Sequence, residues 1–200
     1  MVFTPKTSTE FSVFGLNDVA IKKYGTADTW VDIPGVTTAT YKHTVSEVEQ
    51  TGDDDVIDYW RYGAKGQIVV KASKIAMKAL ERVTSPGDSG SNVVSTASYQ
   101  AISFGKDAEY IPPYLCVRGL VKGRSAGENC WMVIYWFKTV VKTAFEAFPE
   151  GAYGKLTELT LTFDTLQSDK DDAGAALVGD NQCFGRMEIW TAAPPSITYV

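Results

Sequence analysis

The chain has 200 residues, of which 44% are apolar, and it carries a formal net charge of −5. This negative balance excludes the overall basic surface with which proteins grip nucleic acid. The apolar run from residue 130 to 137 is too short to span a bilayer as a helix, so we expect no membrane segment and a protein that stays in the cytosol of the cell that makes it.

The length and apolar content predict a single domain over residues 1–200. Residues 1–10 are polar and predict an N-terminal arm. Residues 11–24 place apolar side chains two apart but are interrupted by Gly-Leu-Asn-Asp, which predicts two short strands or one bent strand. Residues 31–33 predict a short strand that ends at the turn signal Pro34-Gly35.

The next segment is rich in threonine and alternates in polarity. Residues 37–48 predict a strand, and the residues on one of its faces are Ala39, Tyr41, His43 and Val45. Residues 47–70 form two extended segments around an acidic tip that contains glycine. This arrangement predicts a long hairpin or a mobile loop.

Residues 73–84 are the one segment with clear helical periodicity. The apolar stripe consists of Ala76, Ala79, Leu80 and Val83, widened by Ile75 and Met77. Ser73 is the predicted N-cap, and Pro86-Gly87 predicts the end of the helix. A single apolar stripe indicates that the helix lies against a sheet.

The remainder of the chain predicts further strands. They lie at residues 97–104, 114–122, 130–142, 156–166 and 184–190, with a polar loop at 168–182 and a tail at 193–200. The segment 139–148 also permits a helix, and the sequence leaves this open. Eight to ten strands with one helix predict a mainly β fold, a β-sandwich or barrel with one flanking α-helix.

One motif suggests a protease. Gly87-Asp88-Ser89-Gly90 matches the nucleophile loop of chymotrypsin-like serine proteases, and the only histidine, His43, precedes it as in that family. The context does not fit, because Ser89 follows His43 by 46 residues and comes directly after the predicted helix, in the first half of the chain. We therefore interpret the motif as an ordinary loop and expect no catalytic site.

Metal sites are not predicted either. A calcium-binding loop that began at Asp53 would need Gly and Glu where the chain has Asp58 and Ala64. Zinc would need closely spaced ligands. The cysteines, which are Cys116, Cys130 and Cys183, are widely spaced. We expect reduced thiols, no metal and no cofactor.

Several stretches are familiar in their order along the chain. They are VFGLNDVAI with WVDIPGV, the Thr-rich strand, the long acidic loop, GQIVVKASKIAMKALERVT and the late strand KLTELTLTFDTL. This order resembles the major tail (tail tube) proteins of long-tailed, non-contractile bacteriophages over most of residues 10–192. In that family the helix usually ends in Thr-Gly-like residues, and here Ser85-Pro86-Gly87 stands in that place.

The resemblance implies a β-sandwich of two sheets flanked by one helix. It further implies rings of six subunits that stack into a hollow tube, the conduit for DNA delivery into the host. The partners would be further copies of the chain and other phage tail proteins (tape measure, terminator and baseplate or tip), all within the virion. DNA would pass a negative lumen without specific binding.

The acidic segment 47–60 is our candidate for the contact between rings. Tyr59 and Trp60 at its end are predicted to be buried anchors, and its carboxylates to approach basic groups of the next ring. The acidic residues are Glu47, Asp53, Asp54, Asp55 and Asp58, and the basic candidates are Arg118, Lys122 and Arg124. A solvated hairpin with Trp60 folded into its own core remains the alternative.

A second hypothesis comes from a different class of protein. A β-sandwich that binds or cleaves carbohydrate, as an adhesin or hydrolase, would fit the same composition. Cleavage would need two carboxyl groups facing each other across a cleft, and sequence alone does not place them. The sequence leaves this alternative open.

Overall fold

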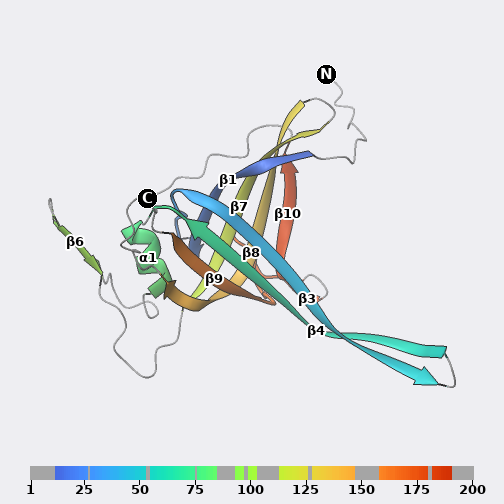
Figure 1. The fold of residues 1–200 in the computed structure, drawn as a ribbon. Helices are drawn as coiled ribbons and strands as arrows, with labels where there is room; N and C mark the ends of the chain where they lie inside the picture. The colour runs from blue at the N-terminus through green and yellow to red at the C-terminus, as the bar shows by residue number, and fades with distance from the viewer. Residues whose placement is uncertain are drawn as a thin grey trace, which may run out of the picture.

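The fold is known from a computed structural model, and Figure 1 shows its arrangement. The described residues are 12–26, 28–52, 55–74, 76–84, 93–96, 99–102, 113–125, 128–146, 158–179 and 182–190. They contain ten β-strands and one α-helix. The mainly β fold with one flanking helix that the sequence predicts is confirmed.

The elements follow one another along the chain in the predicted order, except that two strands, β5 and β6, stand where one strand at 97–104 is predicted. The strands are β1 (Ser12–Lys23), β2 (Val31–Asp32), β3 (Val36–Gly52), β4 (Asp55–Ala72), β5 (Val93–Thr96), β6 (Tyr99–Ile102), β7 (Tyr114–Ser125), β8 (Glu128–Glu146), β9 (Leu159–Leu166) and β10 (Gly185–Trp190). The helix α1 (Met77–Thr84) lies between β4 and β5. Strands β5 and β6 form a small sheet of their own.

The other eight strands form one antiparallel sheet in which β8 is the central element. The order is β2-β1-β7-β8-β9-β4-β3. One edge of β8 pairs with β7, and its other edge pairs first with β10, over Trp131–Trp136, and then with β9, from Lys138 onwards. Because β10 and β9 share one edge of β8, the sheet divides there into two halves.

The two halves fold over each other and enclose the main core (Figure 1). One half supplies side chains such as Val117 from β7, and the other supplies Ile68 from β4 and Phe163 from β9, all of them almost fully buried. The buried positions of β9 alternate, as predicted for a half-buried strand. Leu80 and Val83 of α1 close one end of this core.

The sequence analysis leaves open whether residues 11–24 form two short strands or one bent strand. β1 is a single bent strand, because its register with β7 shifts between Val13 and Gly15 and again between Leu16 and Asp18. Such shifts are β-bulges, which bend a strand without ending it.

The structure contradicts one expectation about where an element begins and settles one alternative that the sequence leaves open. The helix begins at Met77, and Ser73 is not its N-cap: the Ser73 hydroxyl donates to the carbonyl oxygen of Gly35, 3.0 Å away, in the turn between β2 and β3. The segment 139–148, which permits a helix, continues as strand β8 to Glu146. The terminal segments 1–10 and 193–200 and the stop signal Pro86-Gly87 lie outside the described residues.

Candidate assembly surfaces

The most distinctive feature is a β-ribbon that projects from the body (Figure 1). Strands β3 and β4 pair from Val36 and Ala72 out to Gly52 and Asp55. β9 pairs with β4 only between Gly66 and Ala72, so within the described part of the chain Asp55–Lys65 pair with β3 alone. At about 3.3 Å per residue, these eleven residues extend roughly 35 Å. The predicted long hairpin is therefore confirmed, and most of it stands clear of the sheet.

The acidic site candidates lie on this ribbon. Glu47 is exposed on β3 and pairs across the ladder with Arg61. Asp58, Tyr59 and Trp60 lie opposite Gln50, Glu49 and Val48. Asp55 begins β4, and Asp53 and Asp54 lie outside the described residues. The structure therefore places the backbone of these candidates on one projecting element, and the burial of Tyr59 and Trp60 stays a prediction.

Two of the three basic candidates lie together at the far end of the sheet. Lys122 and Arg124 are both exposed and occupy alternate positions of β7, close to the turn into β8. Lys122 lies opposite Trp131 and Arg124 opposite Asn129. These four residues, with Gly123 and Cys130, line a cavity of about 440 Å³. The Lys122 ammonium lies 4.8 Å from the ring centroid of Trp131, within the range of a cation–π interaction.

The third basic candidate, Arg118, is not at the surface, so the expectation that it belongs to an exposed basic group is wrong. Only 3% of the residue is exposed. Its guanidinium lies 3.2 Å from the carboxylate of Asp18 on β1 and 5.5 Å from the ring centroid of Trp30. A buried charge of this kind needs a partner within the fold, and the sequence separates Asp18 from Arg118 by 100 residues.

Arg118 belongs to a group of charges that the sequence analysis did not find. Ala20 of β1 lies between Asp32 of β2 and Arg118 of β7 in the ladder, which brings the Asp18 and Asp32 carboxyl groups together. Burial raises the pKa of Asp32 to about 7, the hydrogen bond and charge of Asp18 add to the rise, and Arg118 opposes it. Two carboxyl groups that share a hydrogen bond are closer than the roughly 5 Å that retaining glycosidases require.

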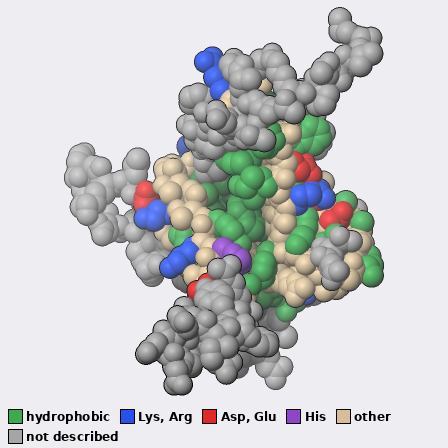
Figure 2. All heavy atoms as spheres, turned by 90° about the vertical axis from the view of Figure 1, so that its right-hand side faces the viewer, with side chains coloured by type: hydrophobic (Ala, Val, Ile, Leu, Met, Phe, Trp, Pro, Cys, Tyr) green, Lys and Arg blue, Asp and Glu red, His purple; other side chains and the backbone are tan. Residues whose placement is uncertain are grey.

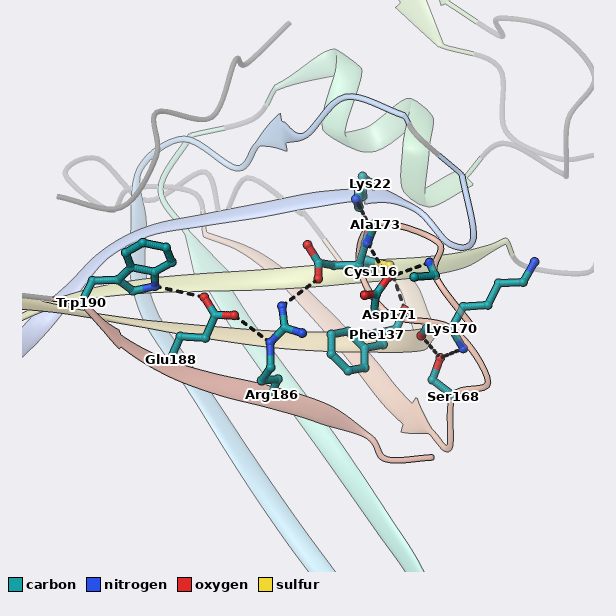
Figure 3. Close-up of polar contacts among 12 residues, drawn as sticks. Lys22, Cys116, Phe137, Ser168, Lys170, Asp171, Ala173, Arg186, Glu188 and Trp190 are labelled. Carbon is teal, nitrogen blue, oxygen red and sulfur yellow. Dashed lines mark hydrogen bonds and ion pairs between the residues drawn. The ribbon is translucent and has the colours of Figure 1, made fainter. Parts of the chain in front are cut away.

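The predicted polar loop 168–182 covers part of the same outer face of β1, β7 and β8 (Figure 3). The Asp171 carboxylate accepts hydrogen bonds from the backbone N–H groups of Ala173 (2.9 Å) and Ala175 (2.8 Å). The buried Lys22 ammonium donates to the carbonyl oxygen of Asp172. The carboxyl group of Asp171 thus fixes the turn, and no group of three potential metal ligands occurs in the described part of the chain.

The loop is fastened to β10 by a second set of contacts. Arg186 lies between two carboxylates, 3.2 Å from Asp172 and 2.7 Å from Glu188. The Trp190 indole N–H donates to Glu188 over 3.0 Å (Figure 3). These contacts involve one face of β10 only.

The opposite face of β10 borders an open apolar groove (Figure 2). The groove has a volume of about 450 Å³ and lies between the two halves of the sheet, and its lining includes Tyr41, Ile134, Trp136 and Met187. Met187 and its neighbour on this face, Ile189, are 60% and 58% exposed. Alternation along β10 indicates two different faces, but the sequence does not indicate that its apolar face is left open.

The protease candidates are not brought into a described site. His43 lies exposed on β3, where its ring stacks on Tyr41 and meets Phe184 edge-on. Ser89 and Asp88 lie outside the described residues. The cysteines that the structure describes are free thiols, as expected. No helix in the described ranges is long and apolar enough to cross a membrane.

Comparisons with known proteins leave the chain outside any assigned family. No family model and no curated protein matches the sequence. Among solved structures, a chain of the anti-feeding prophage baseplate, determined by cryo-EM with six-fold symmetry, matches with a TM-score of 0.43 and 9% identity. The match covers 94% of this chain and 97% of that chain. A likeness this low does not bear on function, which is argued below from the chain's own residues.

Proposed function

We propose that the chain is a structural, non-enzymatic virion protein that assembles with copies of itself into the tail tube of a phage. In this proposal the subunits form stacked, six-membered rings, and the tube conducts DNA into the host. Other tail proteins complete the structure at its ends. The sequence resemblance is the origin of the proposal, and the projecting ribbon is the observation that carries it.

The ribbon supports assembly because, among the described residues, the backbone of the outer part of β4 pairs only within the hairpin. An isolated two-stranded hairpin is at best marginally stable in water. Here Asp55–Lys65 of β4 pair with β3 alone. A further copy of the chain would supply the missing contacts. The apolar groove adds to this argument, since exposed apolar surface favours association.

The net negative charge of the chain is consistent with a tube through which DNA passes. A net charge of −5 keeps phosphate groups from binding along a lumen, whereas a basic wall would bind DNA by releasing its counterions. No catalytic role is part of the proposal: the close carboxyl groups of Asp18 and Asp32 are engaged with Arg118 inside the fold, and those of Asp172 and Glu188 both pair with Arg186.

Shortening the ribbon tests the proposal. Deletion of residues 50–56 removes the acidic tip but leaves the part of the hairpin that pairs with β9. The variant should keep the circular dichroism and the melting temperature of the wild type and fail to polymerise, as judged by sedimentation velocity. Polymers of normal size from this variant would contradict the role of the ribbon.

A further inference from the structure

The two ends of the molecule carry charges of opposite sign. Between Lys42 and Arg61 the ribbon contains six acidic residues and no lysine or arginine. The end of β7 that carries the exposed Lys122 and Arg124 lies at the opposite end of the molecule from the outer end of β3 and β4 (Figure 1). The molecule is therefore electrostatically polar, with an acidic end and a basic end.

The basic end is also hollowed. Lys122, Arg124, Asn129 and Trp131 line the cavity of about 440 Å³. The part of β1 that pairs with this end, residues 12–17, contains no charged residue, and Glu128 is the one acidic residue in the stretch 119–134. Two cations beside an indole ring form a surface that suits carboxylates, because the ring excludes water from one side of the ion pairs.

We infer that the ribbon tip of one copy docks into the cavity formed by Lys122, Arg124 and Trp131 on the next copy. The inference rests on the proposed function, since it names the surface that receives the ribbon. The contact is heterologous, because each copy uses its acidic end once and its basic end once, so copies add in one direction.

Charge complementarity selects the acidic ribbon over nucleic acid as the occupant. Phosphate backbones are bound by stripes of lysine and arginine, with many contacts along the strand. Here the basic group contains two residues, and the chain as a whole is negative. A single exposed ion pair contributes little to affinity, but a ring makes the same contact once per subunit and gains from all of them together.

Charge reversal at both ends tests the inference with the full-length chain. Lys122→Glu with Arg124→Glu should raise the concentration needed for polymerisation by at least about tenfold. A ribbon variant with Asp53, Asp54, Asp55 and Asp58 changed to Lys should fail in the same way. Lys122 and Arg124 are exposed, and Asp55 and Asp58 belong to the part of β4 that does not pair with β9, so the melting temperature of each monomer should stay at the wild-type value.

The most discriminating part of the experiment mixes the two charge-reversal variants. The basic ribbon then faces an acidic cavity, so the mixture should form alternating polymers where neither variant does so alone. The control is Lys74→Glu with Lys78→Glu, which makes the same change in charge at exposed positions beside and in α1 and should assemble normally.

The remaining outcomes distinguish a failure of the proposed docking site from a failure of the proposed tail-tube function. If the wild type polymerises and the Lys122→Glu, Arg124→Glu variant does so equally well, the docking site is wrong and the proposed function stands. If that variant polymerises normally but loses retention of a DNA duplex, the cavity is a nucleic-acid site and the inference is overturned. A wild type that stays monomeric contradicts the proposed function, and the inference with it.

Discussion

Asp32 links the stability of the fold to pH at the scale of a single residue. Its carboxyl group is close to Asp18 and partly buried, and its pKa rises from 3.8 to about 7. Between these two values the folded chain binds a proton that the unfolded chain has released. The free energy of unfolding therefore falls as the pH rises through this window, and this contribution is lost above about 7.

Asp32→Asn tests this assignment. The amide cannot ionise, so the decline in melting temperature between about pH 4 and pH 7 should be shallower than in the wild type. Glu158→Gln is the control, because it removes a carboxylate that is 49% exposed and lies away from Asp18. Equal slopes for the wild type and Asp32→Asn would show that Asp32 carries no proton in this range.

Arg118 shows what sequence reasoning misses at this scale. Together with Lys122 and Arg124 it occupies alternate positions of one strand, so the three residues share one face of the sheet. Whether that face is covered depends on β1, Trp30 and the loop 168–182, all distant in sequence. The Asp18–Asp32 pair was missed for the same reason, since strand register brings it together.

At the scale of the elements, the stability of helix α1 depends on the burial of its apolar side chains. Leu80 is 3% exposed and packs in the main core beside Val83. Leu80→Asp places a charge there without a partner and should cost about 3 kcal/mol or more. We expect insoluble or unfolded protein on expression. Lys78→Asp, at an exposed position of the same helix, should fold normally, and a soluble Leu80→Asp variant with unchanged melting would contradict the packing of α1.

Local signals predicted most elements because they depend on neighbours in sequence. Period-two alternation indicates β9, and helical periodicity indicates α1. Element ends depend on tertiary contacts: Ser73 binds Gly35 across the fold in place of capping the helix. Sheet order is also non-local, and nothing in the sequence indicates that β9 and β10 share one edge of β8.

At the scale of the whole molecule, the described residues present three candidate assembly surfaces. They are the projecting ribbon, the basic cavity at the opposite end and the apolar groove between the sheet halves. Monomeric soluble proteins rarely leave large apolar patches open. Surfaces of these three kinds at different places on one chain suit a polymer in which each copy contacts several others.

Electron microscopy of the purified full-length chain tests self-assembly most directly. Negatively stained samples over a range of concentrations should show rings that stack into hollow tubes of uniform diameter. The tubes should shorten at high salt, because the proposed contact between copies joins opposite charges. Small discrete particles at every concentration, together with binding to glycans, would contradict the account and favour the carbohydrate-binding alternative.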